Sequence, residues 1–90
     1  MRNNITAGFL KESVKITAKV HVDNLRKIAD GTFEYDGSMP KSCVDAMYKK
    51  KAEIDREVLE YLEQFPDDFV MCDEIGYGKE YSGYLKILNQ

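Results

Sequence analysis

The chain has 90 residues, of which 43% are hydrophobic and 32% charged, and its formal net charge is −3. This composition excludes a disordered chain, whose hydrophobicity would be lower, and predicts a single folded domain over residues 1–90. The negative charge gives no overall reason to expect binding to nucleic acid, and no apolar run approaches the ~20 residues of a transmembrane helix.

The first predicted element is a strand over residues 13–22. These residues (SVKITAKVHV) alternate between apolar and polar side chains, and a period of two is typical of a half-buried strand. Residues 5–11 fit either an extension of this strand or a short helical turn. A short helix over residues 24–29 is expected next, ended by Gly31, and residues 32–35 fit another short strand.

The longest predicted element is a helix over about residues 41–65. Residues 36–40 before it read DGSMP, which are turn residue types, and Ser38 or Ser42 is a candidate cap for the helix. Apolar residues recur at helical spacing, no Gly or Pro interrupts the segment, and Pro66 is expected to end it.

Two further strands, residues 69–74 and 81–88, are expected to form a C-terminal hairpin around the turn IGYGKE. The predicted fold class is therefore α+β. It consists of a three- to four-stranded, mainly antiparallel sheet packed on one long amphipathic helix.

The glycines of the predicted turn do not have the spacing of a nucleotide-binding loop. Tyr81 stands where a dinucleotide fingerprint needs its third glycine after Gly76 and Gly78. A hairpin turn is favoured, because glycine adopts positive φ without steric cost. Tyr77 at its tip would be an exposed anchor for a partner protein.

Residues suited to catalysis or metal binding are few. His21 is the only histidine and falls on the polar face of the predicted strand, where we expect it to be solvated. Cys43 and Cys72 are too few for a disulfide framework and form no CxxC motif, so we expect reduced thiols in a cytoplasmic protein. The N-terminus lacks the apolar stretch of a signal peptide. We therefore expect no enzyme activity, no cofactor and no bound metal.

Charge is unevenly distributed along the chain. Residues 1–51 carry ten Lys and Arg against six Asp and Glu, a balance of +4, whereas residues 52–90 carry three against ten, a balance of −7. Acids lie opposite the apolar stripe of the long helix and continue past its C-terminal end, where negative charge opposes the helix dipole. We interpret them as a docking surface, because folding alone does not favour this arrangement. The candidate residues are Glu57, Glu60, Glu63, Asp67, Asp68 and Tyr77.

The leading functional prediction is a small non-catalytic protein-binding module. Its acidic surface would dock on a basic surface of a target such as a nucleic-acid-handling enzyme, as an inhibitor of phage or plasmid type would. The first alternative is a module that binds nucleic acid or a phosphate ligand through the basic face of the predicted strand. The residues of that face are Lys15, Lys19, Arg26 and Lys27.

A structural homodimer is the second alternative. Lys51 and Asp55, four residues apart, lie in or beside the apolar stripe of the long helix. They are expected either to form an ion pair at the rim of the core, with the lysine stem along it, or to belong to an interface.

Overall fold

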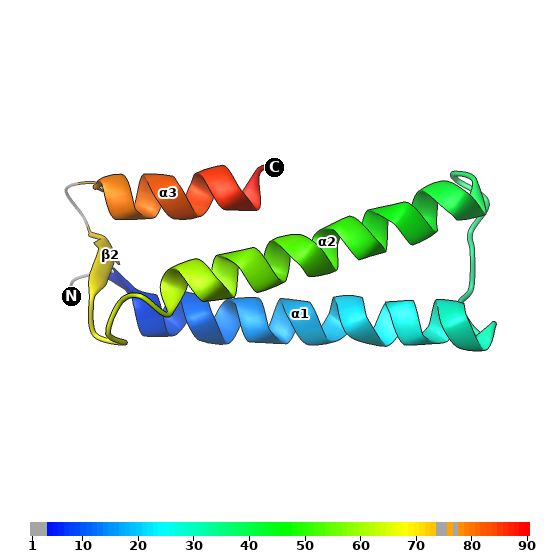
Figure 1. Ribbon diagram of the computed structural model, residues 1–90, viewed down its shortest axis with the longest axis horizontal. Helices are drawn as coiled ribbons and strands as arrows, with labels where there is room; N and C mark the ends of the chain where they lie inside the picture. The colour runs from blue at the N-terminus through cyan, green and yellow to red at the C-terminus, as the bar shows by residue number, and fades with distance from the viewer. Residues whose placement is uncertain (1–3, 74–75, 77) are drawn as a thin grey trace.

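The structure, a computed structural model, describes residues 4–73, 76 and 78–90. These residues form three helices, α1 (Ala7–Asp30), α2 (Lys41–Leu62) and α3 (Lys79–Leu88), and two short strands, β1 (Ile5–Thr6) and β2 (Val70–Cys72). The first two helices form a long antiparallel hairpin, and α3 packs on α2 near the end where the strands pair (Figure 1). The molecule measures 45 × 25 × 19 Å.

The predicted α+β class is wrong, because the described chain is mainly helical with one two-stranded antiparallel sheet. The strand predicted over residues 13–22 and the helix predicted over residues 24–29 are both parts of α1. The helical reading of residues 5–11 holds from Ala7 onward. Gly31 ends α1 as predicted, with a φ of 76° in the left-handed region.

A repeat of three and four residues explains why α1 is helical. Ala7, Leu10 and Val14 are buried, and the half-buried His21 and Ile28 continue the same side of the helix. The alternation within residues 13–22 misleads because its apolar members are not all inside. Ile16, Val20 and Val22 are exposed.

The predicted C-terminal hairpin is also wrong. Residues 81–88 lie in α3, where Tyr81, Tyr84 and Leu85 recur at helical spacing. The strand predicted over residues 69–74 is confirmed only as β2, and it pairs with β1: Ile5 lies opposite Cys72, and Thr6 opposite Val70. Residues 32–35 form no strand.

The long helix is confirmed as α2, which begins at Lys41 and ends at Leu62, slightly before the predicted end. The predicted capping by Ser38 or Ser42 is wrong, because the N-cap residue is Pro40 and no side chain caps the helix. The backbone N–H and hydroxyl of Ser38 instead donate to Asp36 Oδ1, at 2.8 and 2.6 Å, within the predicted turn.

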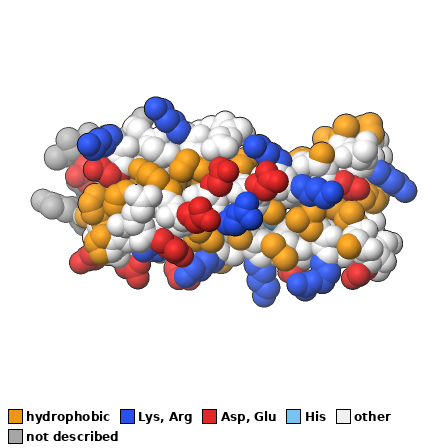
Figure 2. Space-filling model, viewed as in Figure 1, with side chains coloured by type: hydrophobic (Ala, Val, Ile, Leu, Met, Phe, Trp, Pro, Cys, Tyr) orange, Lys and Arg blue, Asp and Glu red, His pale blue; other side chains and the backbone are white. Residues whose placement is uncertain are grey.

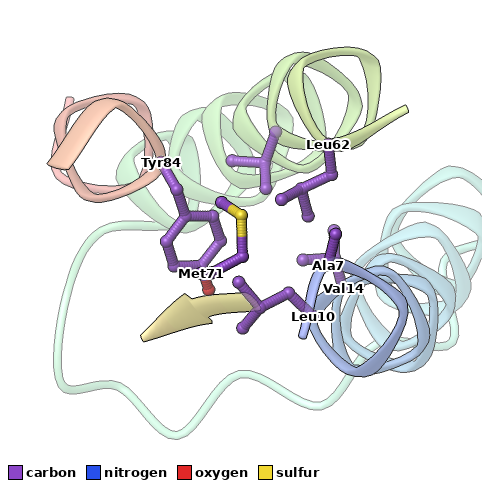
Figure 3. Close-up of a cluster of buried hydrophobic side chains, with 7 residues drawn as sticks. Ala7, Leu10, Val14, Leu62, Met71 and Tyr84 are labelled. Atoms are coloured by element: carbon purple, nitrogen blue, oxygen red, sulfur yellow. The ribbon is translucent and has the colours of Figure 1, made fainter. Parts of the chain in front are cut away.

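The core lies where all the elements meet, at one end of the hairpin (Figure 3). Leu62 of α2 is fully buried, and burying a side chain of this size stabilises a fold by about 1.5–3 kcal/mol. The β-segments are fixed to α1 because Ala7 N donates to Phe69 O at 2.8 Å and Gly8 N to Asp67 O at 2.9 Å. The buried cluster is Ala7, Leu10, Val14, Val58, Leu62, Met71 and Tyr84.

Across the described ranges, none of the helices combines the length and the apolar character needed to cross a membrane.

Candidate functional site

A buried polar pair joins the two long helices away from the core. His21 Nδ1 of α1 lies 2.6 Å from Asp55 Oδ2 of α2, and the two side chains are 14% and 9% exposed. The expected solvated His21 is therefore wrong. The expected Lys51–Asp55 ion pair is also wrong, because Asp55 bonds to His21 and Lys51 Nζ lies 5.8 Å from the centre of the Tyr48 ring.

The contacts around this pair fit a structural role, in which it forms a polar layer between α1 and α2. Its neighbouring ring is Tyr48, whose centre is 6.1 Å from that of the imidazole. Cys43, the thiol in the first turn of α2, is twelve residues from Asp55, or ~18 Å along the helix. A thiol at that separation is out of reach of the imidazole, so the structure does not assemble a Cys–His nucleophile from Cys43 and His21.

The outer face of α2 carries a line of exposed carboxylates. Glu53, Glu57 and Glu60 fall within ~60° of one another around the helix axis, and all three are exposed. None of the three lies within 4.0 Å of a Lys or Arg of the described residues. Glu63 is exposed too, but is turned further around the helix. We call Glu53, Glu57 and Glu60 the acidic stripe.

The acids after the helix do not all join the acidic stripe. Asp67 turns toward α1, where its Oδ1 accepts a bond from Lys11 Nζ at 2.8 Å. This hydrogen bond, followed by the charge of Lys11, lowers the pKa of Asp67 below its ordinary value of 3.8. Asp68 is exposed. Tyr77, the proposed anchor, lies outside the described residues.

The basic candidates lie on a helix, so the strand spacing that suggested phosphate binding does not apply. Lys15, Lys19 and Arg26 follow one outer line of α1, and Lys27 is exposed farther around. Acids of the same helix neutralise part of this charge. Glu12 lies 3.6 Å from Lys15, and Asp23 lies 3.8 Å from Arg26.

A cavity of about 160 Å³ opens at the far end of the hairpin, between the 32–40 loop and the start of α2. Tyr35, one of its lining residues, donates from Oη to Asp45 Oδ1 at 2.7 Å, and this bond is the main cause that raises the pKa of Tyr35. The sequence analysis did not predict this cavity, although the closely spaced aromatic residues Phe33 and Tyr35 of TFEY could have indicated it. The lining residues are Phe33, Glu34, Tyr35, Asp36, Ser38, Met39, Val44, Met47 and Tyr48.

Comparison of the chain with protein-family models, curated proteins and solved structures found no match.

Proposed function

We propose that this chain is a non-catalytic protein-binding module whose acidic stripe docks on a basic surface of a partner. The observation that carries the proposal is the line of three exposed carboxylates, none of which has a Lys or Arg within 4.0 Å among the described residues. Carboxylates that are left unpaired on a rigid helix are available to a partner, and they would steer its basic surface into contact.

The chemistry of the stripe fits a partner whose surface is rich in Lys or Arg, such as the nucleic-acid groove of an enzyme. Docking there would occlude the groove, so the chain would act as an inhibitor. A cytoplasmic location is part of this proposal, and the free thiols of Cys43 and Cys72 fit it.

The basic line of α1 supports the alternative of a phosphate or nucleic-acid ligand less well. Two of its four residues already have carboxylate neighbours, so less positive charge is available to a polyanion. The two proposals differ in the protein surface that carries the binding, and charge reversals on one helix at a time separate them.

The test compares two variants with the same change in net charge. The first is Glu57→Lys/Glu60→Lys, and its matched control is Asp30→Lys/Glu34→Lys, at exposed acids away from the acidic stripe. A partner captured with the tagged wild-type chain is then titrated against each variant over a salt series. We expect the first variant to weaken binding at least roughly tenfold and to flatten the salt dependence, with the control near wild type.

Equal weakening by both variants would mean that only net charge matters, and it would overturn the docking surface. Unchanged binding by Glu57→Lys/Glu60→Lys would do the same. Weaker binding after Lys15→Glu/Lys19→Glu, with nucleic acid as the captured species, would favour the alternative. Helix content measured by circular dichroism controls for folding in every variant.

A further inference from the structure

The outer side of α1 carries an apolar row that the fold leaves uncovered. Phe9, Ile16 and Val20 are 61%, 68% and 53% exposed. They lie within ~40° of one another around the helix axis and extend over ~16 Å of its length. Single exposed apolar residues are ordinary on a protein surface, but an aligned row of three large ones indicates a contact surface. We call these three residues the outer row.

The outer row points away from every element of the described fold that packs on α1. The buried side of the helix, at Ala7, Leu10 and Val14, lies about 130° away around the axis. The turn that follows α2 contacts α1 at Gly8 and Lys11, on another side. Figure 2 shows hydrophobic side chains reaching the surface between charged ones on the face it draws.

The charges beside the outer row favour a second copy of this chain as its occupant. Glu12 and Lys19 flank the row on the same side, and both are exposed; within its own chain Glu12 also forms a solvent-exposed ion pair with Lys15, at 3.6 Å. When two identical helices pack antiparallel about a two-fold axis, the same flank of each meets. With the axis at Ile16, Glu12 of one copy lies opposite residue 20 of the other, about one residue from that copy's Lys19. The two-fold axis produces this Glu12–Lys19 pair twice.

Other arrangements match these charges less well. A parallel pair would set the Glu12–Lys19 flank against Ser13, Thr17 and Asn24, which carry no charge. A partner of one charge sign would satisfy either Glu12 or Lys19 and repel the other. Because Ile16 lies near the middle of the 24-residue α1, the antiparallel overlap runs from residue 7 to residue 25. That is ~28 Å of helix, a long enough seam for a specific interface.

We propose that two copies of this chain associate through the outer rows of their α1 helices, packed antiparallel about a two-fold axis at Ile16. Phe9 and Val20 pack on either side of the axis, and the two Glu12–Lys19 pairs fix the orientation. This interface lies on α1, so it leaves the acidic stripe of α2 open.

Sedimentation equilibrium of the full chain over a concentration series tests the association. We expect wild type to shift from one to two copies as concentration rises. Ile16→Glu sets two carboxylates against each other at the axis and should leave a monomer. Ala46→Glu introduces the same carboxylate at an exposed position of α2 away from the outer row, so it is the matched control and should associate as wild type does.

Charge exchange tests the geometry. Glu12→Lys alone and Lys19→Glu alone each oppose like charges and should weaken association roughly tenfold, whereas Glu12→Lys/Lys19→Glu restores the pairs and should recover it. A wild type that stays monomeric up to its solubility limit would overturn the proposal. A dimer that survives Ile16→Glu, or a double exchange no better than the single ones, would also overturn it. Partner capture through the acidic stripe is measured separately, so neither result decides the other.

Discussion

Lys11 compensates part of the negative charge that collects at the C-terminal end of α2. The last turn of α2 contains no basic residue, although its exposed carbonyls carry partial negative charge and acids surround them. Lys11 of α1 reaches across, and its Nζ donates to Phe65 O at 2.8 Å as well as to Asp67. The acids at this helix end therefore have a partial structural compensation at Asp67, whereas Glu63 and Asp68, like the acidic stripe, have no Lys or Arg within 4.0 Å among the described residues.

Removing this ammonium should destabilise the fold. Lys11→Met keeps most of the aliphatic stem but leaves the Phe65 carbonyl without its donor, so we expect a loss of about 1–3 kcal/mol in the free energy of unfolding, measured with urea. Lys15→Met is the matched control, because Lys15 is a lysine of the same helix whose ion pair with Glu12, at 3.6 Å, is solvent-exposed, and we expect less than about 0.5 kcal/mol there.

The same variant has a defined acid dependence. Because the pKa of folded Asp67 is lowered, its carboxylate stabilises the fold above its ordinary value of 3.8, and this contribution is lost as pH falls through the lower folded pKa. The stability difference between wild type and Lys11→Met should therefore shrink at the lowest pH at which both still fold. A difference independent of pH would show that Asp67 takes no part in it.

At the scale of elements, the sequence predicted α2 well and α1 and α3 wrongly. In α2 the buried side chains of Val44, Val58 and Leu62 recur at helical spacing, and Asp55 is the buried polar exception, so the apolar pattern and the fold agree. In α1 the strand prediction used residues 13–22, where the usual rule of apolar inside and polar outside fails. Ile16, Val20 and Val22 are apolar but exposed, and the polar His21 is half-buried against Asp55. Extending the window back to Ala7 and forward to Ile28 would have shown the helical repeat. The pairing of β1 with β2 joins distant segments and had no local signal.

Gly83, the glycine that follows Gly76 and Gly78 in the C-terminal stretch, has a packing role. It lies within α3 where the helix meets Tyr61 of α2, and a Cβ at this position would overlap the tyrosine hydroxyl and ring. That hydroxyl donates to Glu80 O at 2.7 Å, and the ring packs edge-on against Phe65. The glycine therefore permits close packing between helices, a role that helix propensity alone would not predict, since glycine disfavours helix interiors.

Gly83→Ala should thus lower stability although it improves the helix propensity of α3. We expect a net loss of about 1–3 kcal/mol in urea unfolding, because Tyr61 must move and its hydrogen bond is lost. In the Tyr61→Phe background the closest atom is absent, so the same exchange should cost less. A stabilising Gly83→Ala, or an equal cost in both backgrounds, would contradict the packing role.

The whole molecule depends on how α1 and α2 align, and the His21–Asp55 pair bears on that alignment. The main core gathers at one end of the hairpin, and this polar pair lies farther along both helices. Slipping one helix by a turn would move the imidazole ~5.4 Å from the carboxylate and leave both groups buried without each other. A buried polar layer is a known device for fixing the register of paired helices, at some cost in stability.

This role predicts opposite effects for single and double substitutions. His21→Leu or Asp55→Leu alone leaves the other polar group buried without its partner, so each should cost about 1–3 kcal/mol. His21→Leu/Asp55→Leu fills the layer with apolar side chains and should be as stable as wild type or more so, with a coupling above about 1 kcal/mol in urea unfolding. The double variant should lose uniqueness of register, seen as extra or broadened amide resonances. Additive single effects, or a stable double variant with one sharp set of resonances, would show that apolar packing and the connecting loop alone set the alignment.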